Sequence, residues 1–228
     1  MFLELSYLFG MDEPKWPTNP NDYFVFDSSM SRGDNCNAST IHHHMHNGTH
    51  VDSPRHFTRK GLTIDQLPID QFCFDKPLAL KIPKGKGERL VPEDFSPYGE
   101  QIADCDILLI YTGYADLRAS DPKAFIDDFP CFSAGGAAYL RKNFPKLKAI
   151  ALDVLSVDSA VTGVSDGFAA HHALLDRDET HLERTLLIFE DVNTKLLFES
   201  KTPAKRIYAF PVRFKGLEAA PISMVAEL

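Results

Sequence analysis

Short apolar runs separated by polar, turn-rich segments recur along the chain and predict a series of strands. The runs 77–82 (PLALKI) and 106–113 (DILLIYTG) have the length of strands, and the second is so uniformly apolar that we expect burial on both faces. The run 148–158 (KAIALDVLSVD) predicts a third buried strand that passes into a polar loop. Two more strands are predicted at 186–192 (LLIFEDV) and 206–214 (RIYAFPVRF).

The clearest helix signal lies between two of these strands, at 132–143 (FSAGGAAYLRKN). Ser133 is a suitable N-cap, and Lys142 near the carboxyl end interacts favourably with the helix dipole. A strand, a helix and a second strand in this order predict a crossover, which would pair the strands 106–112 and 148–154 in parallel.

The rest of the chain adds no sign of a second domain. Turn formers dominate the first 40 residues, where we expect short strands joined by ordered loops rather than helices. No linker, repeat or shift in composition divides the sequence. We therefore predict one α/β domain over residues 1–228, with a sheet that mixes parallel and antiparallel strands.

Composition and charge exclude several classes of partner. The chain is 44% hydrophobic and 25% charged, as in ordinary globular proteins, and its formal net charge of −8 opposes binding to nucleic acids or anionic membranes. No apolar run is long enough to span a bilayer, and the apolar start of the chain contains Glu4 and no basic region typical of a signal peptide. We therefore expect a cytoplasmic protein with a small-molecule substrate. The four cysteines form no C-x-x-C pair, which argues against a cysteine metal site.

The histidines point to a metal site, because six of the nine lie within residues 41–58, IHHHMHNGTHVDSPRHFT. Gly48 and the β-branched residues around it oppose a helix, so a loop that passes into a strand is expected. On a strand, His50 and Asp52 point to the same side, and His46 can fold back over the glycine to meet them. Two imidazoles and a carboxylate that converge on one point suit Zn²⁺, Mn²⁺ or Fe²⁺.

The other histidines of the cluster have simpler interpretations. His42, His43 and His44 are adjacent in the sequence, so they cannot all face one site, and we expect at least two of them to lie outside it. A single histidine such as His56 is more often structural than catalytic. The interruptions by polar residues, glycine and proline exclude an expression tag.

The segment 46–57, HNGTHVDSPRHF, resembles the motif H-x-G-T-H-x-D-x-P-x-H-F of the putative cyclase family, which includes bacterial kynurenine formamidases and isatin hydrolases. All eight fixed positions of the motif are present. The resemblance extends over nearly the whole chain, through LLIYTGY at 108–114, FPCFSAGGAAYL at 129–140 and HHALL at 171–175. It implies the swivelling β/β/α fold of that family.

The resemblance also implies a site for two metal ions. His46, His50 and Asp52 match the ligands of one metal. Asp52 also matches a bridge to the second metal, for which His171 matches another ligand. The expected ions are Zn²⁺, one or two per chain, with Mn²⁺ as the alternative, because histidine and carboxylate ligands accept either.

A glutamate that bridges both metals completes the ligand set of the family. Glu190, in LIFEDVN at 187–193, matches the family pattern L-I-x-E-x-x-N-L. It follows His171 by nineteen residues, which requires an insertion, and Glu183 in HLERT is the alternative. We predict Glu190.

The function that the resemblance implies is hydrolysis of a small amide, either an aryl formamide such as N-formylkynurenine or a cyclic amide such as isatin. A metal ion generates hydroxide from water at neutral pH, and His56 matches the residue that carries the proton to the leaving nitrogen. Trp16 matches an aromatic substrate contact, although ordinary packing explains a single tryptophan equally well.

Two other functions use the same residues. A cyclase or dehydratase would employ the metal to stabilise an enolate, and a non-catalytic metal-binding protein would retain only the ligands. The presence of His56 beside a full ligand set argues against the last. Because related proteins assemble and the turn-rich segment around Trp16 is suited to reach a neighbour's site, we expect a homo-oligomer, a dimer or a tetramer.

Overall fold

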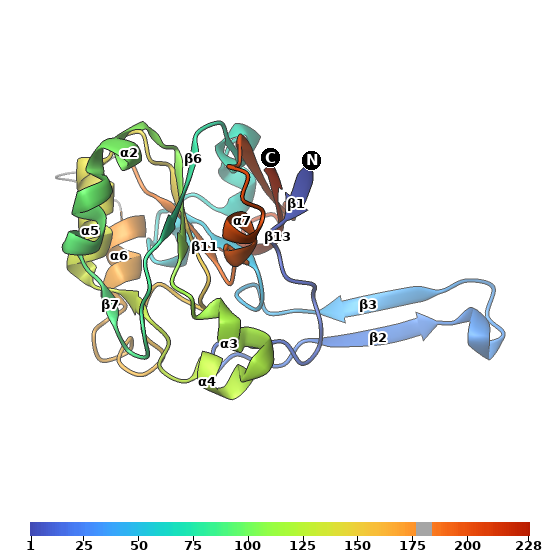
Figure 1. Cartoon of the computed structure of the whole chain (residues 1–228). Coiled ribbons are helices and arrows are strands. Elements are labelled where there is room, and N and C mark those ends of the chain that lie inside the picture. The colour runs from blue at the N-terminus through green and yellow to red at the C-terminus, as the bar shows by residue number, and fades with distance from the viewer. Residues whose placement is uncertain (177–183) are drawn as a thin grey trace.

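The computed structural model describes residues 1–176 and 184–228 as an α/β body from which a two-stranded arm extends (Figure 1). Within these residues, nine strands form the main sheet, in which eight follow the order β5-β12-β13-β4-β11-β10-β8-β6 and β1 pairs with β13. The strands of the main sheet are β1 (Phe2–Glu4), β4 (His50–Asp52), β5 (Cys73–Phe74), β6 (Pro77–Lys81), β8 (Ile107–Tyr111), β10 (Ala149–Leu152), β11 (Leu187–Glu190), β12 (Arg206–Pro211) and β13 (Ala219–Glu227).

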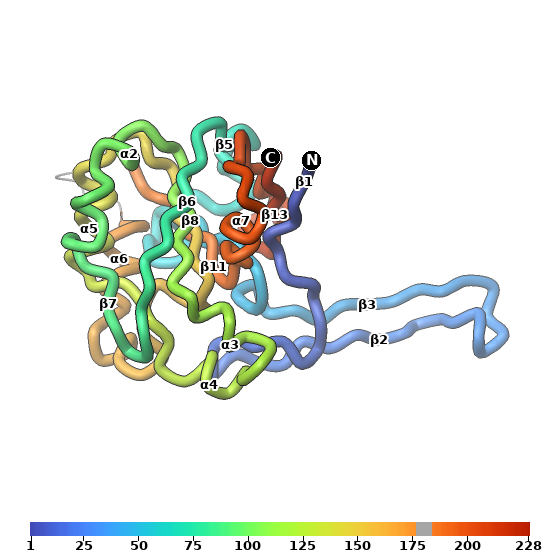
Figure 2. Tube along the Cα trace, in the orientation of Figure 1, coloured from blue at the N-terminus to red at the C-terminus, as the bar shows by residue number. Residues whose placement is uncertain are grey.

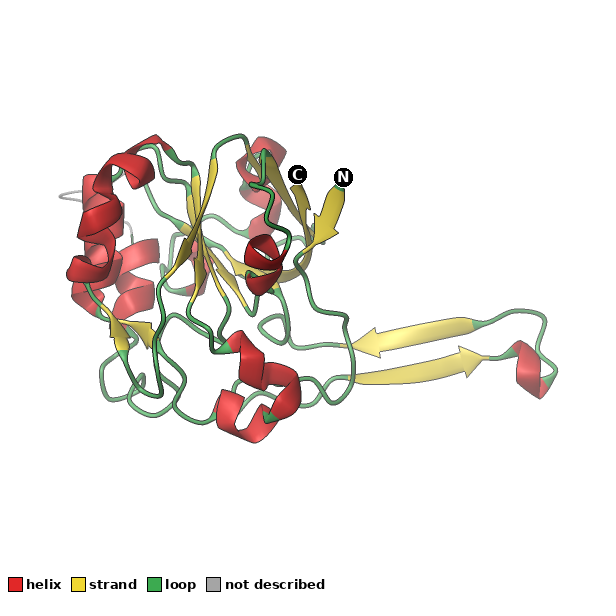
Figure 3. Cartoon of the chain, viewed as in Figure 1, coloured by secondary structure: helices red, strands yellow, loops and turns green. Residues whose placement is uncertain are grey.

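The remaining elements are two short strand pairs and the helices (Figure 3). The strand pairs are β2 (Tyr23–Ser28) with β3 (Ala38–His42), and β7 (Arg89–Leu90) with β9 (Cys131–Phe132). The α-helices are α1 (Pro92–Phe95), α2 (Gly99–Asp104), α3 (Ala115–Ser120), α4 (Pro122–Ile126), α5 (Ala134–Asn143), α6 (Ala169–Leu175) and α7 (Lys195–Glu199). Among the described residues, no helix has the length and hydrophobicity needed to cross a membrane.

The sheet mixes parallel and antiparallel strands, as predicted. Strands β6, β8, β10 and β11 pair in parallel, and β4 pairs antiparallel with β11 on one side and with β13 on the other. The chain passes from β8 through α5 to the parallel neighbour β10, which confirms the predicted crossover. The three-residue strand β4 therefore joins the parallel half of the sheet to its antiparallel half.

Helix α5 begins where the sequence predicts it. The Ser133 hydroxyl accepts a hydrogen bond from the backbone N–H of Gly136 at 2.9 Å and caps the helix. A Cβ atom at Gly136 would lie 2.3 Å from the carbonyl oxygen of Leu90, so only glycine permits this approach between α5 and β7. The helix packs against α6 on one side of the sheet (Figure 1).

Both faces of the sheet are covered, and β8 shows this along its length. Leu108 and Ile110 belong to the hydrophobic cluster beneath α5 and α6, whereas Ile107 and Leu109 belong to the cluster on the opposite face. All four side chains are fully buried, which confirms the expectation from the uninterrupted apolar run.

Several elements had no prediction from the apolar pattern, among them α6 and β13. Helix α6 has only seven residues, too few for a helical period to stand out. Strand β13 alternates between buried and partly exposed residues along most of its length. The predicted strand at 206–214 also ends earlier than expected, at Pro211.

The first 40 residues form short strands and loops, as expected, and supply most of the arm, but they also contain the 3₁₀ helix Met30–Arg32 between β2 and β3, which was not expected. Strands β2 and β3 pair antiparallel, and all five residues of β3 are exposed. The trace in Figure 2 shows the arm leaving the body with no other segment beside its outer part, while β1 runs next to β13.

Candidate active site

The centre of the candidate site is the buried strand β4. Its His50 and Asp52 side chains point to one side, with Nε2 of His50 3.4 Å from Oδ1 of Asp52. The antiparallel register places Glu190 of β11 opposite His50, and its Oε2 atom lies 3.4 Å from the same Nε2. All three side chains are almost completely buried. The structure thus brings together the residues that the strand periodicity and the glutamate motif predicted.

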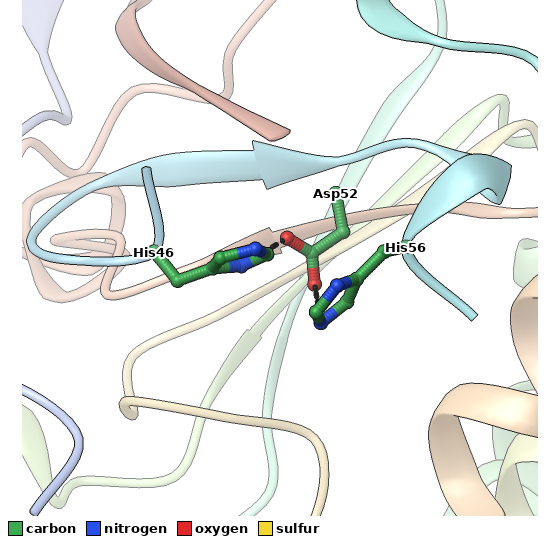
Figure 4. Close-up of side chains that lie close together, drawn as sticks. All are labelled: His46, Asp52 and His56. Atoms are coloured by element: carbon green, nitrogen blue, oxygen red, sulfur yellow. Dashed lines mark ion pairs between the residues drawn. The ribbon is translucent and has the colours of Figure 1, made fainter. Parts of the chain in front are cut away.

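Two further histidines approach Asp52 from either side (Figure 4). The chain turns at Gly48, whose φ of +65° favours glycine, and Nδ1 of His46 lies 2.9 Å from Oδ1 of Asp52. His56 ends the short 3₁₀ turn Pro54–His56, and its Nε2 atom lies 3.9 Å from Oδ2 of Asp52. Each imidazole therefore faces a different oxygen of one carboxylate.

His171 completes the group from helix α6. Its Nε2 atom lies 3.4 Å from Oδ2 of Asp52 and 3.5 Å from Oε1 of Glu190. On the outer side of the ring, Nδ1 lies 2.7 Å from Oδ2 of Asp158. The backbone N–H groups of Ala170 and His171 also donate to Asp158, so this carboxylate fixes the first turn of α6 together with the ring.

The alternative glutamate, Glu183, lies outside the described residues. Glu190 lies beside His50 because β11 pairs antiparallel with β4 in this register.

The outer hydrogen bonds of His50 and His171 direct one nitrogen of each ring to the centre. Nδ1 of His50 lies 2.8 Å from the carbonyl oxygen of Gly48, which can only accept, so this nitrogen carries the proton and Nε2 faces Asp52. The Asp158 carboxylate has the same effect on His171. Histidine ligands of metals in proteins commonly make this kind of outer hydrogen bond. Sequence reasoning did not assign Asp158 to the site, because only the fold brings it next to His171.

Burial and charge act against each other at the centre. Burial opposes the ionisation of Asp52, but the His56 and His46 imidazoles hold the pKa of this carboxyl well below its usual value. Burial also disfavours the charged form of His50, yet the carboxylates of Asp52 and Glu190 raise the pKa of His50 to about 10. For His56 burial dominates and lowers the pKa to about 4. A divalent cation that binds among close carboxylates and imidazoles displaces the protons that these side chains otherwise hold.

Both oxygens of Asp52 and Nε2 of His50 are buried and make no hydrogen bond of good geometry. Such atoms are rare in folded proteins, because an unsatisfied buried polar group costs free energy, and a bound cation would satisfy them. Two overlapping sets of ligand atoms could hold one, namely His46, Asp52 and His56, and His50, Asp52 and Glu190, each with its atoms within 4.8 Å of one another. The residues therefore fit a divalent ion.

A cavity of about 260 Å³ opens beside this group of side chains. Its wall includes His56, His171 and Glu190, and also Trp16 and Phe168, whose ring centroids are 6.2 Å apart. Phe168 has a φ of +52°, a conformation that a bulky side chain rarely adopts and that is typical of functional sites. Trp16 thus lies in the cavity wall, and it also packs against the core.

The three adjacent histidines separate as expected. His42 stacks on Tyr23 in the arm, with ring centroids 4.2 Å apart, and Nδ1 of His43 lies 3.1 Å from Oδ1 of Asp22. His44 lines the cavity. Two of the three therefore lie outside the candidate site.

Comparison with known proteins gives a match over most of the chain. A family model described as "Putative cyclase" matches residues 3–159. A protein of Haemophilus influenzae described as "Uncharacterized protein" is 32% identical over 135 residues, which cover 59% of this chain and 88% of that protein. Cyclase-like protein 3 of Arabidopsis thaliana is 25% identical over 226 residues, 96% of this chain and 76% of that protein. A kynurenine formamidase of Salinibacter ruber is 24% identical over 214 residues, 92% of this chain and 89% of that protein.

Solved structures share the fold. Isatin hydrolase A from Labrenzia aggregata, bound to benzyl benzoate, superposes with a TM-score of 0.80 at 17% identity and covers 99% of this chain and 93% of its own. A structure described as a potential metal-dependent hydrolase with cyclase activity has a TM-score of 0.73 at 18% identity, over 99% of this chain and 96% of its own.

Proposed function

The chain belongs to the putative cyclase family, and from this premise we propose that it is a metal-dependent hydrolase of a small amide. The observation that carries the proposal is the convergence of four imidazoles and two carboxylates on one buried point, with both Asp52 oxygens lacking a hydrogen bond. Relatives named as a kynurenine formamidase and as isatin hydrolases support hydrolysis of a C–N bond. We propose that residues 1–228 act as one domain of this kind.

The proposed ligands hold one or two Zn²⁺ ions, with Mn²⁺ as the alternative. These ligands are His46, His50, Asp52, His171 and Glu190. A divalent ion at this position supplies a Lewis acid for the substrate carbonyl and lowers the pKa of water from 15.7 to about 7. The protein fixes the directions from which the ligands approach, because His50 and His171 are both held from outside by hydrogen bonds.

His56 is the proposed proton carrier. Its ring lines the cavity and packs against the His46 ring, with centroids 4.1 Å apart. An imidazole there can take a proton from the attacking water and deliver it to the leaving nitrogen, which amide cleavage requires. The cavity wall also exposes Trp16, Phe57 and Phe168, and we propose that these rings orient an aryl group of the substrate.

Reconstitution tests this function. The protein is stripped of metal, reloaded with Zn²⁺ or Mn²⁺, and assayed with N-formylkynurenine first and isatin second, beside the His50→Ala variant as a ligand-deficient control. We expect hydrolysis that depends on the added ion and is lost in the variant. Metal-dependent conversion of a carbonyl substrate without C–N cleavage would identify a cyclase or dehydratase. Stoichiometric metal without turnover would identify a binding protein, and no metal uptake would refute the proposal.

We also propose a homo-oligomer, a dimer or a tetramer. The arm formed by β2 and β3 supports it, because Val25, Phe26 and Ile41 are 41%, 62% and 63% exposed. A lone two-stranded hairpin is only marginally stable in water, so these apolar side chains need a covering surface, which a second copy would provide.

A further inference from the structure

Glu218 approaches the candidate site from a segment to which neither the sequence motif nor the proposed function assigns a role. Its Oε1 atom lies 3.4 Å from Nε2 of His46, on the opposite side of the ring from Nδ1, which faces Asp52 at 2.9 Å. The His46 ring therefore has one carboxylate on each side. The inner one is buried at the centre of the site, and the outer one is 37% exposed.

The backbone determines where Glu218 lies. Its carbonyl oxygen accepts hydrogen bonds from both the N–H and the hydroxyl of Ser53, at 2.9 Å and 2.7 Å. The next residue, Ala219, begins β13 and pairs with Asp52. The register between β4 and β13 thus fixes Glu218 beside the strand that carries the proposed ligands.

The loop before Glu218 is also anchored. The carbonyl oxygen of Leu217 accepts from the N–H of Ile64, and the N–H of Gly216 donates to the Asp65 carboxylate at 2.8 Å. Gly216 has a φ of +81°, so the chain makes a turn there that favours glycine. Because the backbone of this loop is already anchored, forming the contact with His46 costs less conformational entropy than forming an ion pair from a free loop. The contact is therefore more stable than a typical surface ion pair.

We propose that Glu218 is a positioning residue that accepts a hydrogen bond from Nε2 of His46 and so directs Nδ1 to the metal. This inference rests on the proposed function, which makes His46 a ligand. Each of the three histidine ligands then has its own outer acceptor: the Gly48 carbonyl for His50, Asp158 for His171 and Glu218 for His46. Loss of such an outer partner typically weakens metal binding by about 10–100-fold.

The test compares Zn²⁺ affinity in the full chain and in three variants, by competition with a chelator. Glu218→Ala removes the acceptor, and Glu218→Gln keeps an oxygen that can accept without the charge. Glu100→Gln, on the exposed surface of α2, is the matched control for the loss of a negative charge. We expect Glu218→Ala to weaken Zn²⁺ binding by about 10–100-fold, Glu218→Gln to restore part of the affinity, and the control to match the wild type.

A spectroscopic measurement separates positioning from general stability. In the zinc-loaded protein, ¹⁵N chemical shifts of the His46 ring report which nitrogen binds the metal, and we expect Nδ1 bound and Nε2 protonated in the wild type but a mixture in Glu218→Ala. Unchanged affinity and shifts in Glu218→Ala would overturn the inference. Equal losses in both Glu218 variants would overturn it as well, because the charge or a direct metal bond would then matter. A wild-type chain that takes up no metal would instead refute the proposed function.

Discussion

At the scale of single residues, the site depends on Asp52. It is fully buried, and four imidazoles, those of His46, His50, His56 and His171, lie around its two oxygens, with distances between 2.9 Å and 3.9 Å. A carboxylate has room for more than one cation because each oxygen has two lone pairs. His46 and His50 lie nearest one oxygen of Asp52, and His56 and His171 lie nearest the other. Single substitutions can therefore test the role of each side chain separately.

His56→Ala tests the proton carrier. We expect turnover to fall by about 10²–10⁴-fold with metal content nearly unchanged, because His56 lines the cavity and its Nε2 atom is the most distant from Asp52. Kinetics and elemental analysis on the same sample measure both quantities. His56 also belongs to one of the two possible ligand sets, so loss of metal in this variant would make His56 a ligand instead.

Glu190→Gln tests the glutamate ligand. Removing this charge leaves His50 with Asp52 alone and takes one of three nearby carboxylates from His171, so we expect both metal content and activity to fall. The comparison is Glu183→Gln, which we expect to behave as wild type. If Glu183→Gln loses metal and activity while Glu190→Gln keeps both, the insertion was placed wrongly in the sequence.

The residues that we propose as inner ligands were candidates from the sequence and converge in the structure, whereas the outer residues Asp158 and Glu218 were not candidates, for a physical reason. His46, His50 and Asp52 lie within seven residues, so strand alternation and a glycine turn predict that they meet. Asp158 and Glu218 have no such local signal. Their positions depend on the start of α6 and on the register between β4 and β13, which tertiary pairing determines.

At the scale of elements, the sequence predicts well those strands and helices whose signal lies within one segment of the chain. The crossover from β8 through α5 to β10 follows from two apolar runs and a capped helix, and the structure confirms it. The arm was not predicted as a projecting hairpin. Turn formers predict short strands here, but the sequence does not show that the two strands pair with each other and project from the body, because that depends on tertiary structure.

Two adjacent glycines in α5 give a matched test of its packing. Gly136→Ala would place a Cβ atom 2.3 Å from the Leu90 carbonyl oxygen, and we expect it to destabilise the protein by about 1–3 kcal/mol. At Gly135 the nearest atom is 3.9 Å away, so Gly135→Ala should raise stability by up to about 1 kcal/mol through helix propensity. Urea unfolding measures both. Similar effects of the two substitutions would contradict the close approach of α5 to β7.

A buried ion pair connects α3 to the loop after β11. Arg118 donates to both carboxylate oxygens of Asp191 at 2.8 Å and to Glu13 at 2.7 Å. Arg118→Met would leave the buried Asp191 without its cation, and we expect a loss of about 3–5 kcal/mol in unfolding free energy. The control Lys86→Met breaks an exposed pair with Asp127 and should leave stability unchanged. Equal effects in the two variants would show that burial does not govern the Arg118 pair.

At the scale of the whole molecule, the arm predicts self-association. We expect light scattering at micromolar concentration to give a multiple of 25.5 kDa for the wild type. Phe26→Asp combined with Ile41→Asp should shift the mass toward the monomer, because charges on the arm oppose its burial. Val164→Asp, at a side chain 79% exposed outside the arm, is the control and should keep the wild-type mass. A monomeric wild type would refute the oligomer.

The position of β4 in the sheet has a consequence for the order of folding. The partners of this strand come from distant parts of the chain: Thr49 bonds to Asp191 across 142 positions, and Ser53 to Glu218 across 165. Contacts of such long range form late, because the loop entropy must be overcome first. We therefore expect a nascent chain to lack the site until β13 has emerged, and we expect the proposed metal ion not to nucleate folding around the histidine segment alone. Binding of the proposed metal would then mark a chain in which β13 has paired with β4.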